Sequence, residues 1–159
     1  WLAPASAIES SALAAWLRSS TWGYPAVEAA HIWGLGVLIG TAIAFDLRLL
    51  GVSPRLPVDA LARLLLPCAR VAFGLVVISG LLLFMMQATT FVTQALFYVK
   101  MGTIFLAVLN TALFHRGVFR SVAAWNTTPH TPAAARTAAL VSMTAWTFAL
   151  ICGRWLAYA

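Results

Sequence analysis

The sequence is poor in charged residues and in acids above all. Only 4 of its 159 residues are Asp or Glu, and charged residues make up 9%, against roughly 25% in soluble domains. The acids lie far apart in the sequence, and neither a G-x-S-x-G nor an H-E-x-x-H motif occurs. The composition excludes an ordinary soluble domain, and we do not expect a stand-alone enzyme.

Cysteine and clustered basic residues are scarce as well. Cys68 and Cys152 form no CxxC pair or Cys/His cluster, so we expect two buried, unpaired thiols. The formal charge is +6, but the ten Lys and Arg residues are spread singly along the chain. A nucleic-acid interface needs them grouped on one face, so nucleic-acid binding is excluded.

Apolar residues are abundant instead, at 62% of the chain. They gather in four stretches, each longer than the ~20 residues that cross a bilayer as a helix. Lipid solvates such stretches provided that the backbone is bonded internally. The sequence therefore predicts an all-α, polytopic membrane four-helix bundle over residues 25–159, in contact with the lipid bilayer. The predicted spans are 25–49, 60–87, 93–116 and 132–155.

Residues 1–24 precede the first span and are too polar to cross a membrane. Ser6 and Glu9 have the spacing of a capping box, which predicts an amphipathic helix over 6–19. Trp16 and Trp22 would place it at the membrane interface on the outer side. Because the chain begins at Trp1 and residues 1–20 lack a signal-peptide pattern, we expect a processed or incomplete N-terminus.

Glycines recur within the first two spans. Gly36 and Gly40 have small-xxx-small spacing, and Gly74 and Gly80 lie in the second span. Such residues let helices approach closely. We therefore predict helix packing at all four, and association with other membrane subunits or with further copies of the chain.

The basic residues are distributed unevenly about the predicted spans. One side holds Arg48, Arg55, Arg63, Arg70, Arg116, Arg120 and Arg136, whereas the other holds Arg18, Lys100 and Arg154. Because cytoplasmic loops are enriched in Lys and Arg, the first side is predicted to be cytoplasmic. Both termini are then periplasmic.

Ionisable residues within the spans are costly and need a partner or a purpose. An outer layer holds Glu28, His31, Lys100 and Arg154 at similar predicted depth. One interpretation is interfacial anchoring, with Lys and Arg extending to the headgroups. The alternative is a cofactor site formed by His31, Lys100 and Arg154, with His31 as a metal ligand, haem ligand or proton carrier.

An inner layer holds Asp46, Arg70, Asn110 and His115, with Arg48 nearby. Because buried charges are normally paired, we predict a structural ion pair between Asp46 and Arg70. The functional alternative is a cofactor site of Arg70, Asn110 and His115 for an anionic or quinone-like headgroup.

Haem b would need two histidines at one depth. His31 and His115 are predicted ~20 Å apart along the membrane normal, at ~1.5 Å per helical residue. His130 falls in a loop. A bis-histidine haem within one chain is therefore not expected, whereas a single-histidine site or one shared with another subunit stays open.

Five motifs are spread between residues 26 and 158. They are E28-x-x-H31, F45-D46-L47-R48-L49-L50-G51, F97-Y98-x-K100, N110-x-x-x-F114-H115-R116 and G153-R154-W155-x-A157-Y158. Together they resemble a family of small bacterial four-helix inner-membrane proteins with no assigned activity, and the resemblance implies a multi-pass protein of the bacterial inner membrane. The overall shape is also similar to the membrane domains of copper-resistance and cytochrome b561-type proteins, whose paired intramembrane histidines this sequence lacks.

Three functions agree with these features. The leading prediction is an accessory or anchor subunit of a bacterial membrane assembly, respiratory or otherwise engaged in electron transfer. It leads because nearly all intramembrane charges can be paired or can reach the headgroups. The alternatives are a redox subunit that binds haem b or quinone, and a carrier of small solutes or metal ions.

Overall fold

The computed structural model describes residues 2–128 and 130–158, and every regular element in them is a helix. Four of these helices are long and apolar enough to cross a bilayer, and the chain is a multi-pass membrane protein. Each of their ends lies within two residues of its predicted position. The elements are α1 (Leu2–Glu9), α2 (Ala12–Ser19), α3 (Gly23–Leu49), α4 (Val58–Met86), α5 (Ala88–Thr93), α6 (Ala95–Arg116), η1 (Val118–Ala124) and α7 (Ala133–Trp155).

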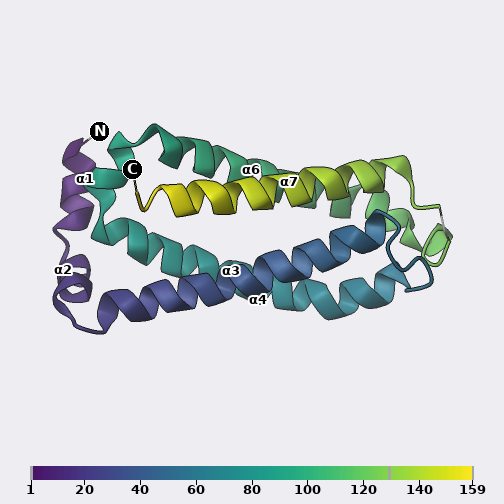
Figure 1. Cartoon of the computed structure of the whole chain (residues 1–159), viewed down its shortest axis with the longest axis horizontal. Coiled ribbons are helices and arrows are strands. Elements are labelled where there is room, and N and C mark those ends of the chain that lie inside the picture. The colour runs from purple at the N-terminus through teal and green to yellow at the C-terminus, as the bar shows by residue number, and fades with distance from the viewer. Residues whose placement is uncertain (1, 129, 159) are drawn as a thin grey trace.

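The four long helices form two hairpins joined along one side. Helix α3 packs on α4, α6 packs on α7, and α3 packs on α7 (Figure 1). No described backbone contact joins α4 to α6. The chain exposes 9383 Å², against about 7,800 Å² for a compact soluble chain of its mass. The bundle is therefore open between α4 and α6.

Short elements close this opening at its two ends. At the end of the bundle where α1 and α2 lie, called the outer end after the predicted orientation, Phe84 of α4, Phe91 of α5 and Phe97 of α6 stack, with ring centroids 5.4–6.3 Å apart. The opposite end is called the inner end. At the inner end, η1 packs against α4, α6 and α7. The gap between α4 and α6 consequently lies in the middle of the membrane-spanning region.

Small residues do bring helices together, but mostly not the predicted ones. A β-carbon at Gly34 would lie 2.9 Å from Val76 Cγ2, so α3 meets α4 there. Gly36, Gly40 and Gly74 have no described atom within 4 Å of such a position. Their predicted packing is wrong within the chain, because they face away from its helix contacts. Helix α7 instead presents a buried stripe of small residues: Ala135, Ala139, Ser142, Ala145 and Ala149.

The N-terminal segment forms two short helices, not the single helix predicted. The Ser6 hydroxyl donates to the Ala3 carbonyl (2.9 Å) inside α1, so Ser6 is no N-cap. Ser11 caps α2 by accepting from the Ala14 N–H at 3.4 Å. The predicted capping box is wrong because the chain breaks between α1 and α2, and that break supplies its own serine cap.

Glu9 and Arg18 tie these helices to the bundle. Glu9 Oε2 accepts from the Thr89 hydroxyl (2.6 Å) and the Thr89 N–H (2.8 Å) at the start of α5. Arg18 donates to the Glu9 carbonyl (2.8 Å) and the Met86 carbonyl (3.1 Å). Helix α1 therefore lies across the outer end of the bundle (Figure 1).

The inner end depends on a buried arginine. Arg48 is 2% exposed, and it donates to the carbonyls of Leu56 (2.6 Å), Pro54 (2.9 Å) and Asn126 (3.2 Å). The Asn126 amide in turn donates to Asp59 Oδ1 at 2.6 Å. Arg48 thus fastens the α3–α4 loop to the segment after η1, and so links the two hairpins.

We predict that Arg48→Met lowers the free energy of unfolding by about 3 kcal/mol, because three carbonyls lose the charged donor that the buried Arg48 supplies. The measurement is unfolding by SDS in mixed micelles, followed by circular dichroism. Arg55 is exposed in the same loop, so Arg55→Met is the matched control and should cost less than about 0.5 kcal/mol. Equal losses in the two variants would contradict the role given to Arg48.

The hydrogen bonds from Thr89, together with the nearby Arg18, hold the pKa of the Glu9 carboxyl below its ordinary value. A lowered pKa stabilises the docked state above the unfolded glutamate pKa of about 4.3, and this contribution is lost as pH falls through the folded value. We expect the protection of the α1 amides against hydrogen exchange, relative to the unprotected rate at the same pH, to fall over that acid range. Glu9→Gln should remove the pH dependence, whereas Glu28→Gln, at an exposed glutamate, should keep it.

Candidate functional site

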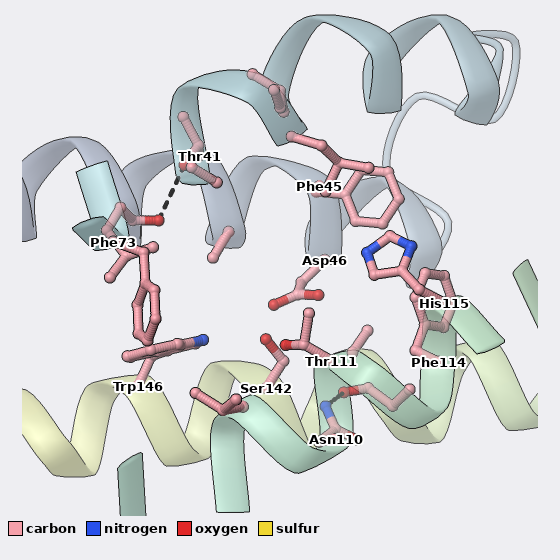
Figure 2. A pocket seen from close by; sticks show the side chains of 18 of the residues that line it. Thr41, Phe45, Asp46, Phe73, Asn110, Thr111, Phe114, His115, Ser142 and Trp146 are labelled. Carbon is pink, nitrogen blue, oxygen red and sulfur yellow. Dashed lines mark hydrogen bonds between the residues drawn. The ribbon is translucent and has the colours of Figure 1, made fainter. Parts of the chain in front are cut away.

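A cavity of about 490 Å³ lies on the inner side of the open bundle, with walls from α3, α4, α6 and α7. Its lining is mainly apolar, and it includes Phe73 and Trp146 (Figure 2). The polar members of the lining are Thr41, Asp46, Arg70, Asn110, Thr111, His115 and Ser142. The structure therefore brings Asp46 and the predicted Arg70, Asn110 and His115 to one cavity.

Asp46 is the buried carboxyl group of this cavity. It is 5% exposed, and its Oδ2 has no hydrogen-bond partner among the described residues. The Ser142 hydroxyl of α7 faces the carboxylate (Figure 2). A buried carboxylate oxygen without a hydrogen-bond donor destabilises the folded protein. The burial of Asp46 is therefore the feature of the cavity that most needs a functional explanation.

The predicted Asp46–Arg70 ion pair is not formed. Among residues 2–128 and 130–158, the ion pair within 4.0 Å joins Arg63 to Asp59, at 2.7 Å. Arg70 is exposed and its Nε donates to the Leu66 carbonyl (3.2 Å), one turn nearer the inner end of α4. The long side chain folds back along its own helix instead of crossing the cavity to Asp46.

His115 and Asn110 occupy the α6 wall in different ways. The His115 ring packs edge-on against Phe114 and Phe119, with centroids 5.1 and 5.0 Å away, and the Arg70 charge acts on it. Asn110 Nδ2 donates to the Ala138 carbonyl of α7 at 2.9 Å. Asn110 therefore joins α6 to α7, whereas His115 and Arg70 form the polar edge of the cavity.

The hydroxyls of the cavity were not predicted as site residues. The Thr41 hydroxyl donates to the Val37 carbonyl (2.7 Å) and that of Thr111 to the Ala107 carbonyl (2.9 Å). Such back-bonding leaves no signal in the sequence, because Thr and Ser are common in membrane helices. The small-residue spacing around Ser142 is the signal that could have placed it on a buried face.

The predicted outer layer is only partly assembled. His31 Nδ1 lies 2.9 Å from Ser79 Oγ, which itself donates to the Leu75 carbonyl (2.6 Å). The Ser79 hydroxyl has one hydrogen and donates it to the Leu75 carbonyl, so His31 Nδ1 must be the donor in its contact with Ser79. The Lys100 charge acts on the same ring. Gly80 and Gly153 leave space for the His31 and Lys100 side chains. A β-carbon at Gly80 would lie 3.2 Å from His31 Cε1, and one at Gly153 would lie 3.4 Å from Lys100 Nζ.

Arg154 and Glu28 do not complete this layer. Arg154 hydrogen-bonds the Tyr158 hydroxyl and lies 4.6 Å from the centre of that ring, while Glu28 is exposed. In the described part of the chain, no group of three or more His, Cys, Asp or Glu side chains could hold a metal ion. The structure supplies no further ligands for the predicted metal at His31.

The thiols and the two histidines lie apart from one another. Cys152 is buried as predicted, but Cys68 is exposed, because it lies on a side of α4 that no other helix covers. His31 belongs to the outer part of α3 and His115 to the inner end of α6. Comparison with known proteins finds no match to any protein-family model, curated protein or solved structure.

Proposed function

We propose that this membrane protein binds a small lipid-borne ligand with a polar headgroup, of the quinone class, in the cavity between α4 and α6. The observation that carries the proposal is the position of that cavity. The residues of α4 and α6 that line it belong to the stretch in which the described backbones of the two helices make no contact, between the stacked phenylalanines and η1. A hydrophobic molecule dissolved in the bilayer can reach it sideways, without crossing water.

The lining suits such a ligand. Its volume of about 490 Å³ falls in the range of roughly 300–1,000 Å³ typical of small-molecule sites, which are mostly apolar with a few polar groups. Arg70 and His115 offer donors to a carbonyl or oxyanion of the headgroup. Of the two redox cofactors predicted from the sequence, quinone is supported better than haem, which would need axial ligands that the separated histidines do not provide.

A second proposed role, as a subunit of a larger bacterial inner-membrane assembly, is compatible with this binding. It is favoured by the outward faces of α4 and α6. In an apolar 18-residue stretch of each of these helices only 11% and 6% of the residues are buried, against 39% in α3 and α7. A β-carbon added at Gly36 or Gly40 of α3, or at Gly74 of α4, would meet no described atom within 4 Å, so these positions allow close approach by another helix. The arginine-rich loops favour an orientation with both termini in the periplasm.

We predict that decylubiquinone quenches the fluorescence of Trp146, which lines the cavity, when the protein is titrated in lipid nanodiscs. Trp146→Phe should remove the saturable part of the quenching. Ala112 lines the α6 wall, so Ala112→Phe should fill the cavity and weaken binding about tenfold, or ~1.4 kcal/mol.

Leu109→Phe is the matched control, because Leu109 is 42% exposed on the same helix and does not line the cavity. It should leave the affinity unchanged. Quenching without saturation, or equal weakening by the two phenylalanines, would contradict binding in this cavity.

The proposed orientation gives a labelling prediction. In a protein without native cysteines, Ser20→Cys at the outer end should react with a membrane-impermeant maleimide in intact spheroplasts. Ser53→Cys, in the loop between α3 and α4, should react only after permeabilisation. The reverse pattern would place the termini in the cytoplasm.

A further inference from the structure

We propose that Asp46 selects ligands that present a hydroxyl hydrogen, so that the cavity prefers phenols and hydroquinones to the corresponding ethers and quinones. The inference rests on the proposed function and deepens it, because it names the chemical group that the deepest part of the site recognises.

Asp46 can accept more hydrogen bonds than the described residues give it. An ionised carboxylate only accepts hydrogen bonds, and it has room for about four. Asp46 Oδ2 is buried at the cavity wall without a donor, and Ser142 faces the same carboxylate. A ligand atom that satisfies Oδ2 must therefore bring a hydrogen.

The polar side chains that line the cavity do not donate a hydrogen bond to Asp46 Oδ2. The hydroxyls of Thr41 and Thr111 donate to carbonyls of their own helices. The Asn110 amide donates to Ala138, and Arg70 Nε donates to Leu66. Arg70 and His115 keep further N–H groups, but no described donor around the cavity lies within hydrogen-bond distance of Oδ2. The structure therefore leaves that position to a donor from outside the chain.

The donor that suits Asp46 is a hydroxyl and not an ammonium ion. Arg70 lines the same cavity, and its positive charge disfavours a second cation there. It also offers a donor to any oxygen at the other end of the headgroup, together with His115. A neutral ring with one hydroxyl toward Asp46 and one oxygen toward Arg70 and His115 satisfies both walls.

The test uses two redox-inert probes that differ only in this hydrogen: radiolabelled 4-nonylphenol and its methyl ether, 4-nonylanisole. Binding is measured as saturable uptake by protein-containing nanodiscs in excess of empty nanodiscs of the same lipid. The wild-type protein should bind the phenol about tenfold to hundredfold more tightly than the ether, as for a hydrogen bond to a charged acceptor.

Asp46→Leu should abolish that preference while still binding both probes, because it keeps an apolar wall and removes the acceptor. Thr103→Val is the matched control and should retain the preference, because the Thr103 hydroxyl is bonded to the Val99 carbonyl of its own helix and Thr103 does not line the cavity. Asp46→Asn provides a second variant, which should bind the ether and phenol with a ratio between those of the wild type and Asp46→Leu.

The outcomes separate the two proposals. Equal binding of phenol and ether by the wild type, or an unchanged preference in Asp46→Leu, overturns the inference and leaves the cavity as a ligand site. If neither probe shows saturable uptake over empty nanodiscs, and decylubiquinone shows no saturable quenching either, the proposed function fails and the inference falls with it.

Discussion

The packing of α3 against both α4 and α7 is the contact on which the membrane-spanning part of the structure depends. The other contact between long helices, that of α6 with α7, stays within one hairpin, and among the described residues the backbones of α4 and α6 make no contact. In the membrane the hairpins are therefore joined along the contact of α3 with α7, and at the ends by Arg48, η1 and the stacked phenylalanines. The cavity is a direct consequence, because the helices surround a space that they close on only three sides.

This arrangement explains why a carboxylate can remain on α3. Asp46 lies one turn before the chain leaves the helix, on the face that α7 covers with small residues. Ser142 gives it one neighbouring hydroxyl, and the cavity gives its second oxygen space for a donor. A carboxylate at this depth is usually balanced by an ion pair. Because Asp46 forms none among the described residues, the cavity prefers ligands that bring a hydroxyl hydrogen to it.

Much of the fold follows from the sequence, and the reason is physical. Hydropathy and length fixed the spans to within two residues, because lipid imposes one secondary structure on apolar stretches. Antiparallel threading also placed Asp46, Arg70, Asn110 and His115 at one depth, and the structure brings them to one cavity. Depth along the membrane normal is what residue counting measures best.

Counting residues along the sequence did not predict how each helix is rotated about its own axis, and so which of its residues face a neighbouring helix. Arg70 shares a depth with Asp46 but bonds Leu66 instead, and Gly36 and Gly40 face away from the neighbouring helices. The cap at Ser6 failed for a related reason, since Glu9 is engaged by Thr89, 80 residues further along the chain. Spacing alone contains no information about such distant partners.

The proposed function depends above all on a cavity that opens to lipid between α4 and α6. A spin label at Thr111→Cys, in a protein without native cysteines, measures this by collision with oxygen, which dissolves in lipid, and with a nickel chelate, which stays in water. We expect oxygen accessibility close to that of a label at Phe105, which is 66% exposed on the same helix, and little contact with nickel. Low accessibility to both reagents would show a closed bundle, and high accessibility to nickel would show a water-filled cavity. Either result would overturn a cavity that is open to lipid.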